Sequence, residues 1–406
     1  MTQCRICKAD IRPFISFGKQ PIANGFLTQK DFAEEYFYEL EVCFCDKCKM
    51  VQLADTPDPT QMFHENYAFF SGTSKAMGVH FKNFADDITK KYLDDKDPFV
   101  VEVGSNDGIM LKNFAASGIR HLGVEPSANV AAEARKHGVN TICEFFGKET
   151  AREIVRENGQ ADAFLGANVM CHIPDMHSVV KGLAVLMKPK GVIAFEDPYL
   201  GDIIEKTSYD QIYDEHVFLF SLTSIQHTFS QHGFELIDAI PQKTHGGSMR
   251  YVLARKGARP VSPAVKAGLD RENAMGLSKP ETYERFRKNC EKSKVDLLAF
   301  LQDLKSKNKT VVGYAATSKS TTVLNYCGIS SDLLPKIFDT TPLKQGKFSP
   351  GSHIPVVEYS KFKENYPDYA LLFGWNHKEE ITAKEKEFTG QGGRWLVYVP
   401  KVEEVK

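Results

Sequence analysis

The chain of 406 residues lacks any long hydrophobic run and has almost no net charge. A helix that crosses a bilayer needs about 20 mainly apolar residues in a row, and the N-terminal stretch MTQCRICKAD has no apolar core of a secretion signal. We therefore expect a cytoplasmic protein with no membrane partner. A formal net charge of -1 gives no overall basic field to attract nucleic acid. We expect a small-molecule partner instead.

Cysteines are unevenly placed, since the nine in the chain include five in the first fifty residues. In a reducing compartment, clustered thiols bind metal more often than they form disulfides. The pairs CRIC and CDKC each present two thiolates from one tight turn, and two such turns complete a tetrahedral site for structural zinc. The predicted ligands are Cys4, Cys7, Cys45 and Cys48.

Two alternatives accompany this zinc site. A thioredoxin-like redox pair is the alternative for either motif alone, but redox chemistry does not need two matched pairs. Cys43 breaks the two-residue spacing, so we expect it in the core. The other four cysteines, which are scattered, are expected to be buried small apolar residues.

A glycine turn follows the apolar run at 99–103 in PFVVEVGSNDGIMLKNF, which predicts a strand, a turn and a helix. The Gly-x-x-x-Gly spacing differs from the Gly-x-Gly-x-x-Gly of dinucleotide folds, and acidic residues around the turn would repel a pyrophosphate. The turn suits a cationic cofactor without phosphate, which favours S-adenosylmethionine (SAM). An acid at the end of the next strand can bind ribose hydroxyls. The predicted cofactor-binding residues are Glu102, Gly104, Asn106, Gly108, Glu125 and Asn168.

Four proton-handling side chains are adjacent in QIYDEHVFLF, where Tyr213 to His216 precede an apolar segment. The stretches ADAFLGANVMCHIPD and GVIAFEDPYL predict two further strands, and FELIDAIPQKTHGGSMRYVLAR predicts an antiparallel hairpin. Ligands of open parallel sheets lie at the carboxyl ends of the strands, and both His172 and residues 213–216 follow such ends. The alternatives are a solvated turn for residues 213–216, an ordinary loop histidine for His172 and a core aromatic for Tyr67.

Taken together, these stretches resemble the sugar C-methyltransferases that act on nucleotide-linked 4-keto-6-deoxyhexoses. The resemblance runs nearly end to end, through VCFCDKCKMVQL, ENYAFFSGTS, EVGSNDG, ANVMCHIPD, YDEHVFLFSL, HGGSMR, LNYCGI and KQGKFSPGSHIPV. It implies an α/β protein with a doubly wound class I methyltransferase sheet, a small zinc-binding N-terminal domain and a C-terminal Rossmann-like α/β domain. The expected boundaries are 1–70, 71–257 and 258–406.

The resemblance also implies which residues surround the sugar: Tyr67, His172, Tyr213, Glu215 and His216. A proton next to a ketone is weakly acidic, so a base must remove it while another group stabilises the enolate oxygen. We expect His216 to be the base, because imidazole titrates near neutral pH, although Tyr213 remains open as an alternative. Tyr213 and His172 are candidate donors to the enolate oxygen. The expected reaction is methylation of a ring carbon, carbon 3, beside the ketone.

The C-terminal third contains KTVVGYAATSKSTTVLNYCGI, which predicts a strand, a small-residue loop and a helix. In the family this domain holds the nucleotide diphosphate, and a helix N-terminus with serine and lysine suits an anion. Many relatives have Pro-Ala-Lys-Gly where this chain has ATSKST, so dTDP and GDP both stay open. The predicted substrate-binding residues are Lys319, Ser320, Lys344, Gln345 and Asn376.

Two other functions remain open from the sequence. A SAM-dependent sugar O-methyltransferase would need a base but no enolate support. A non-catalytic zinc-knuckle protein, with a degenerate cofactor fold and nucleic acid as its candidate partner, would need neither. The near-neutral charge and the acid at Glu125 argue against it.

Overall fold

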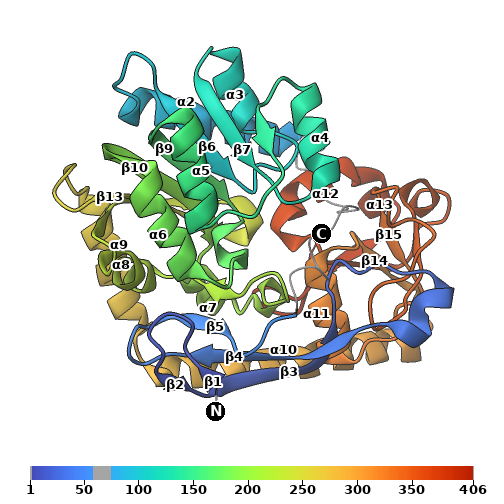
Figure 1. Cartoon of the computed structure of the whole chain (residues 1–406). Helices are drawn as coiled ribbons and strands as arrows, with labels where there is room; N and C mark the ends of the chain where they lie inside the picture. Colours follow the sequence, from blue (N-terminus) through green and yellow to red (C-terminus); the bar gives the residue numbers. More distant parts are fainter. Residues whose placement is uncertain (1, 58–74, 406) are drawn as a thin grey trace.

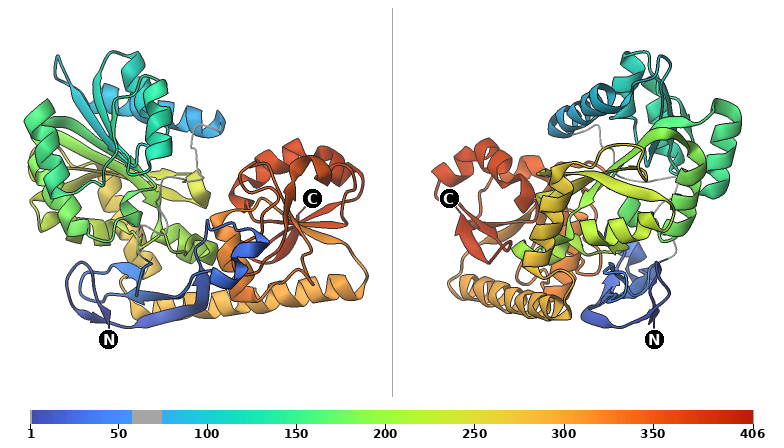
Figure 2. Two further views of the ribbon diagram at one scale, coloured as in Figure 1. Left: turned by 45° about the vertical axis from the view of Figure 1, so that its right-hand side comes forward. Right: turned by 90° about the vertical axis from the view of Figure 1, so that its left-hand side faces the viewer.

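A computed structural model describes residues 2–57 and 75–405 of the chain. Three sheets and a short two-stranded ribbon form its framework. The N-terminal sheet and the long helix α10 (Pro280–Ser306) run beneath the two larger α/β units (Figures 1 and 2). In the described ranges, no helix combines the length and the apolar character needed to cross a membrane.

The N-terminal region is an antiparallel sheet with a ribbon beside it. The ribbon pairs β1 (Thr2–Gln3) with β2 (Asp10–Ile11), and the sheet has the order β11-β5-β4-β3. Its strands are β3 (Pro13–Pro21), β4 (Phe37–Phe44), β5 (Val51–Leu53) and β11 (Phe218–Leu219), and a 3-10 helix η1 (Gln29–Glu34) joins β3 to β4. The fourth strand therefore comes from a part of the chain that is distant in sequence.

The central sheet has seven strands in the order β12-β13-β10-β9-β6-β7-β8, and β13 alone runs antiparallel to both of its neighbours. The strands are β6 (Phe99–Val103), β7 (Arg120–Val124), β8 (Thr141–Ile142), β9 (Ala161–Ala167), β10 (Met187–Pro198), β12 (Phe234–Gln242) and β13 (Ser248–Arg255). Every residue of β6 is buried, as expected for a parallel strand covered on both faces. This is the predicted class I methyltransferase sheet.

Helices surround this sheet and supply the turns at its edge. They are α2 (Lys75–Tyr92), α3 (Leu111–Ala116), α4 (Ala128–Lys136), α5 (Lys148–Asn158), α6 (Met176–Leu186), α7 (Leu200–Lys206) and α8 (Leu222–Ser230). Short 3-10 turns η3 (Met170–His172), η4 (Tyr209–Gln211) and η5 (Thr244–Gly246) lie between them. All three turns carry residues of the candidate site.

The C-terminal region is a second α/β unit with the sheet order β16-β15-β14-β17-β18-β19, parallel except for β19. Its strands are β14 (Val311–Tyr314), β15 (Ile337–Asp339), β16 (Val356–Glu358), β17 (Tyr369–Leu372), β18 (Arg394–Val397) and β19 (Glu403–Val405). The remaining helical segments are α9 (Pro263–Met275), α11 (Ser318–Cys327), η6 (Tyr359–Phe362), η7 (Trp375–His377), α12 (Lys378–Lys384) and α13 (Lys386–Gly390). This arrangement confirms the predicted Rossmann-like C-terminal domain.

One apolar core joins the N-terminal sheet, the C-terminal sheet and helical segments of the central unit. Phe17 of β3 packs edge-on against Tyr326 of α11, with ring centroids 4.8 Å apart, and Tyr209 of η4 stacks 6.2 Å from Phe17. The same cluster of buried residues extends to Leu371 of β17. Because one core is shared, the three units are fixed relative to one another.

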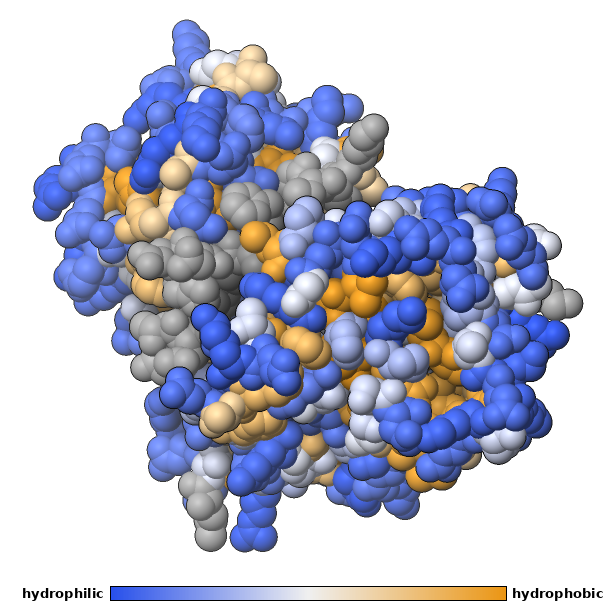
Figure 3. All heavy atoms as spheres, turned by 90° about the vertical axis from the view of Figure 1, so that its right-hand side faces the viewer, coloured by the Kyte–Doolittle hydropathy of each residue, from blue (hydrophilic) through white to orange (hydrophobic). Residues whose placement is uncertain are grey.

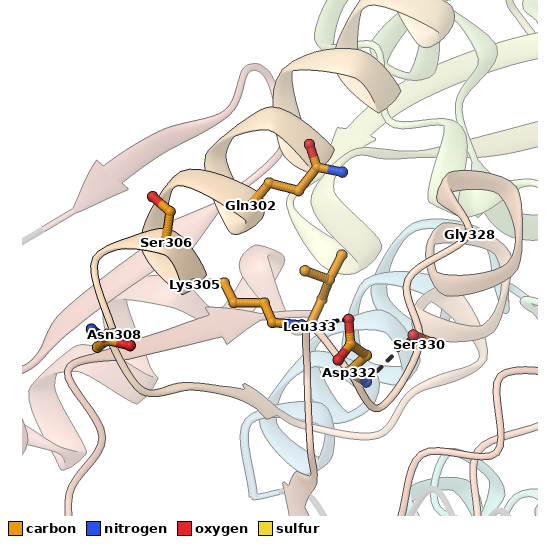
Figure 4. A pocket seen from close by; sticks show the side chains of 8 residues that line it. All are labelled: Gln302, Lys305, Ser306, Asn308, Gly328, Ser330, Asp332 and Leu333. Atoms are coloured by element: carbon orange, nitrogen blue, oxygen red, sulfur yellow. Dashed lines mark hydrogen bonds and ion pairs between the residues drawn. The ribbon is translucent and has the colours of Figure 1, made fainter.

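The face that carries the C-terminal unit is mostly hydrophilic, and hydrophobic residues show in a hollow on it (Figure 3). A separate open recess lies between the end of α10 and the loop after α11 (Figure 4). It is lined by Gln302, Lys305, Ser306, Asn308, Gly328, Ser330, Asp332 and Leu333. An ion pair from Lys305 to Asp332 at 2.5 Å crosses it. None of the predicted site residues lies in this recess.

Candidate active site

The four cysteines of the two knuckles converge on one point. Their Sγ atoms lie within 4.8 Å of one another, and the closest pairs are 3.5 Å and 3.4 Å apart. A buried set of four sulfur donors fits zinc and leaves no position for water or substrate. The structure thus confirms the predicted zinc ligands, Cys4, Cys7, Cys45 and Cys48. Cys43 is fully buried and stands outside the set, as predicted.

The two knuckles close in the same way. The amide of Lys8 donates to the carbonyl of Cys4 at 3.0 Å, and the amide of Lys49 donates to the carbonyl of Cys45 at 2.8 Å. Both lysines have positive φ, 60° and 59°, which turns the chain sharply after each pair. Gln52 of β5 donates to the Cys4 sulfur at 3.0 Å. The zinc site is therefore tied to the sheet that includes β11.

The predicted cofactor loop connects β6 to α3. Gly104 and Gly108 have φ of +62° and +78°, and a Cβ added at Gly104 would lie 2.6 Å from Cγ2 of Val169. Only glycine permits this approach of the loop to the segment after β9. Glu125, at the end of β7, accepts hydrogen bonds from the amides of Asn106 at 3.0 Å and Ser127 at 2.8 Å. The carboxylate is thus held against the loop.

Buried polar atoms at this loop fit a polar cofactor. Ser105 Oγ and Asn168 Oδ1 are buried and have no hydrogen-bond partner among the described residues, whereas such atoms are nearly always satisfied in folded proteins. Asn168 has a positive φ of 54°, and its amide donates to the Glu196 carbonyl at 2.7 Å. Burial, followed by the charge of Glu125, raises the pKa of Glu102 well above its usual range. The loop therefore offers hydrogen-bond partners to a cofactor. The side chain of Glu102 adds no strong negative charge to the loop.

Tyr213 and His216 form a hydrogen-bonded pair. A tight turn, in which the His216 amide donates to the Tyr213 carbonyl at 3.0 Å, brings both rings to one side. His216 Nδ1 lies 2.5 Å from the Gln211 carbonyl oxygen, and the Tyr213 hydroxyl lies 2.9 Å from Nε2. Because a carbonyl only accepts, Nδ1 carries the hydrogen and the hydroxyl donates to Nε2. Nε2 is therefore the basic nitrogen, and it faces the phenol.

Burial keeps the histidines of this region neutral. It lowers the pKa of His216 to about 4, with a further lowering by the charge of Lys319. The His172 ring stacks 5.3 Å from that of His216. Burial also lowers the pKa of His172 and of His245 well below the usual range, and His216 adds to both effects. Three imidazoles thus converge as uncharged groups.

A loop of the zinc-binding region inserts beside this pair. Asn24 Nδ2 donates to Glu215 Oε1 at 2.9 Å, and the amide of Ala23 donates to Asp214 Oδ1 at 2.9 Å. Thr321 of α11 donates to the Ala23 carbonyl at 2.8 Å. Burial raises the pKa of Glu215, while the hydrogen bond from Asn24 and the charge of Lys344 lower it. All three structural units therefore meet at Glu215.

Lys319 and Asn376 lie together on the C-terminal side. Lys319 Nζ donates to Asn376 Oδ1 at 3.1 Å and to the His245 carbonyl at 3.4 Å, and it lies 5.3 Å from the Trp375 ring centroid. Burial lowers the pKa of Lys319 to about 8, and the charge of Asp210 opposes this. Trp375 Nε1 donates to Asp210 Oδ2 at 2.6 Å. The buried cation of Lys319 thus lies beside the backbone of His245.

The other C-terminal candidates, Ser320, Lys344 and Gln345, form hydrogen bonds with backbone carbonyls of their own unit. Ser320 is fully buried and donates its hydroxyl to the Thr317 carbonyl at 2.5 Å. Lys344 donates to the Ala316 carbonyl at 2.8 Å, and Gln345 donates to the Asp339 carbonyl at 3.0 Å. Lys344 therefore approaches Glu215, whereas the Ser320 hydroxyl is already engaged. Tyr67 lies outside the described residues.

Comparison with known proteins covers the whole chain. A zinc binding domain model matches residues 4–63, a methyltransferase domain model matches 79–239, and a C-methyltransferase C-terminal domain model matches 243–400. The C-methyltransferase NovU of Streptomyces niveus is 34% identical over 403 residues, which cover 98% of this chain and 96% of NovU. The chain belongs to the C-methyltransferases.

Membership of the C-methyltransferases makes the chain an enzyme with SAM as methyl donor and a four-cysteine zinc site. The non-catalytic alternative is thereby excluded. A ubiquinone biosynthesis O-methyltransferase of Ralstonia nicotianae is 32% identical over 98 residues, which cover 24% of this chain and 41% of that protein.

Among solved structures, magnesium protoporphyrin IX methyltransferase (ChlM) of Synechocystis PCC 6803 with bound SAH is 13% identical. The match has a TM-score of 0.35 and covers 45% of this chain and 88% of that chain.

Three residues at the site of this C-methyltransferase were missed by sequence reasoning. Asn24 is in a stretch with no chemical pattern, and its role depends on where distant segments meet. Gln211 begins the stretch that contains Tyr213 to His216, but it acts through its backbone carbonyl, which no side-chain pattern indicates. His245 is part of THGGSMR, which was interpreted only as a hairpin turn. The resemblance of HGGSMR to a family motif was the one signal that could have identified His245.

Proposed function

We propose that the enzyme transfers the methyl group of SAM to a ring carbon, carbon 3, of a nucleotide-linked 4-keto-6-deoxyhexose, through an enolate. The observation that carries this proposal is the Tyr213–His216 pair, with a neutral base whose free nitrogen faces a phenol. An ordinary surface turn would not bury a tyrosine, two carboxylates and a histidine together.

The base in this proposal is His216. Its lowered pKa keeps it neutral at pH 7, so Nε2 accepts a proton without prior deprotonation. The proton reaches Nε2 either directly or through the Tyr213 hydroxyl, which passes its own hydrogen to Nε2 and takes the one from carbon. Both routes end with a protonated His216 and an enolate, so the charge balance is the same.

Neighbouring groups would support the enolate and orient the sugar. In this proposal His172, stacked against His216, donates to the enolate oxygen, and Glu215 binds a sugar hydroxyl while Asn24 holds its other side. Tyr67 remains a predicted contact to the sugar. The contact from His172 strengthens as negative charge develops on the enolate oxygen, which is the condition for lowering the barrier.

The nucleotide diphosphate would lie on the C-terminal side. Lys319 is a buried ammonium whose hydrogen bonds among the described residues go to neutral oxygens, Asn376 Oδ1 and the His245 carbonyl, and it suits a phosphate oxygen. Lys344 is a second cation nearby, and Gln345 flanks it. Ser320 would contribute its place at the start of α11 rather than its engaged hydroxyl. Whether the substrate carries dTDP or GDP is decided by the experiment described below.

The cofactor residues keep their predicted roles in this proposal. When bound, SAM supplies the electrophilic methyl group that the enolate carbon attacks. Gly104 and Gly108 permit close approach, Glu125 binds ribose hydroxyls, and Asn106 and Asn168 offer hydrogen bonds. Glu102 would act as a neutral neighbour, because its pKa is raised.

Mass spectrometry tests the proposal with SAM and freshly generated dTDP- and GDP-linked 4-keto-6-deoxyhexoses. Wild type should add one methylene mass to one of them, and His216→Ala should not. His137→Ala, an exposed histidine on the methyltransferase unit, is the matched control and should keep the activity. No added mass with any acceptor, despite measured SAM binding, would refute the substrate class.

Solvent deuterium exchange separates the proposal from a sugar O-methyltransferase. An enzyme that forms an enolate should exchange the proton beside the ketone in D₂O without SAM, whereas an O-methyltransferase has no reason to do so. Tyr213→Phe distinguishes the two proton routes, because exchange survives only if His216 acts directly. Absence of exchange in wild type would favour O-methylation.

A further inference from the structure

A second cluster of metal-binding side chains lies at the candidate active site, far in sequence from the zinc knuckles. Cys171 and His172 follow β9, and His216 precedes β11. One ligand atom from each of the three lies within 4.8 Å of the others. Among the described residues, this set and the four knuckle cysteines are the two such groupings.

The three donors, one sulfur and two imidazole nitrogens, match one class of ion. Thiolate with imidazole selects borderline-soft ions such as Zn²⁺, Co²⁺ or Cu²⁺ over Mg²⁺ and Ca²⁺, which prefer oxygen. Bonds of about 2.0–2.3 Å place neighbouring ligand atoms closer together than the present upper bound of 4.8 Å.

The hydrogen bonds of His216 already fit a metal ligand. Its Nδ1 donates to the Gln211 carbonyl at 2.5 Å, and a backbone carbonyl on the other ring nitrogen is the common support of a metal-bound histidine. This bond fixes Nε2 as the nitrogen with the free electron pair. Among the described residues, the Tyr213 hydroxyl, 2.9 Å away, must turn aside for an ion to bind there.

We propose that Cys171, His172 and His216 form a second, weaker site for Zn²⁺ or a similar ion, and that its occupation inhibits the enzyme. The inhibitory part rests on the proposed function, because the ion would occupy the electron pair of Nε2 that accepts the substrate proton. Coordination replaces the thiol hydrogen of Cys171 by a sulfur–metal bond, and the proton leaves to solvent. The site is weaker than the knuckles because it has three protein ligands and one sulfur.

Cobalt spectroscopy tests the site itself and needs no methyl acceptor. Full-length protein with its knuckle zinc in place is titrated with Co²⁺, and a thiolate-to-cobalt absorption band in the near ultraviolet reports coordination by cysteine. The band should appear in wild type and vanish in Cys171→Ala. Cys290→Ala, which removes an equally buried thiol on α10, is the matched control and should keep the band. Cys171→Ser serves if the alanine variant does not fold.

Enzyme assays test the inhibition. Free Zn²⁺ beyond the knuckle stoichiometry should abolish methyl transfer by wild type, and EDTA at a concentration that spares the knuckles should restore it. Cys171 is not assigned to catalysis, so Cys171→Ser should keep basal activity and require at least about tenfold more Zn²⁺ for half inhibition.

The two arms separate the possible failures. A cobalt band equal in wild type and Cys171→Ala, or no band at all, would overturn the metal site whatever the substrate is. Equal Zn²⁺ sensitivity of wild type and Cys171→Ser would overturn the inhibition. A Cys171-dependent band in a protein that methylates no keto sugar would support the site and count against the proposed function alone.

Discussion

The hydrogen bond from Asn24 to Glu215 provides the sharpest test of how the zinc-binding region contributes to the active site. Asn24→Ala removes a donor 2.9 Å from a buried carboxylate. A hydrogen bond to a charged group is worth roughly 1.5–3 kcal/mol, and each 1.4 kcal/mol is a factor of about ten. If Glu215 binds the sugar as a carboxylate, kcat/KM should fall by about 10- to 100-fold.

A pH profile makes this prediction specific to Glu215. Asn24 lowers the pKa of Glu215, so its removal raises that pKa further above the usual range. The acid limb of kcat/KM should therefore move to higher pH in Asn24→Ala, and part of the activity should return as the pH rises. Asn273→Ala, an exposed asparagine on α9, is the control for loss of an asparagine. An unchanged acid limb and unchanged kcat/KM in a folded Asn24→Ala protein would refute the reasoning.

Three further predictions follow from the geometry. Gly104→Ala would force a Cβ to 2.6 Å from Val169 at a positive φ, so SAM binding measured by calorimetry should weaken at least about tenfold, while Gly118→Ala, whose Cβ would meet nothing, should bind SAM normally. Cys45→Ser removes one of four zinc ligands, so the zinc content should fall and the unfolding temperature should drop, whereas Cys143→Ser at the surface should change neither. His216, with its pKa lowered to about 4, stays neutral in the folded protein while the unfolded chain takes up a proton below about pH 6.5. The contribution of His216 to the free energy of unfolding should therefore be constant above about pH 6.5 and fall as the pH decreases towards 4, and urea titrations should show a shallower fall for His216→Phe.

Features encoded within short stretches could be predicted from the sequence. The zinc ligands were predicted correctly because each Cys-x-x-Cys turn is a local structure. Each turn supplies two ligands, so two turns are needed to complete a four-ligand zinc site. The strand, turn and helix around the cofactor loop also followed from local patterns, because the run at 99–103 and the glycines after it fix a strand and a tight turn.

Contacts between distant segments could not be predicted. The tautomer of His216 depends on a backbone carbonyl of Gln211, and no side-chain pattern indicates where a carbonyl points. Glu215 was predicted as a residue around the sugar, and nothing in the sequence indicated its hydrogen bond from Asn24, which is far away in the chain. Ser320 was predicted as part of an anion site at the start of a helix, and in the structure its hydroxyl donates to the Thr317 carbonyl. In each case the answer depends on packing rather than on spacing.

The pairing of β11 with β5 has a practical consequence for engineering. Leu219 pairs with Val51 and the Leu53 amide donates to the Val217 carbonyl, so the strand that directly follows His216 is part of the zinc-bearing sheet. Chimeras that join the first region of one homologue to the catalytic region of another would mismatch this seam unless both strands come from the same parent. Recombination points between homologues are better placed so that residues 51–53 and 217–219 are inherited together.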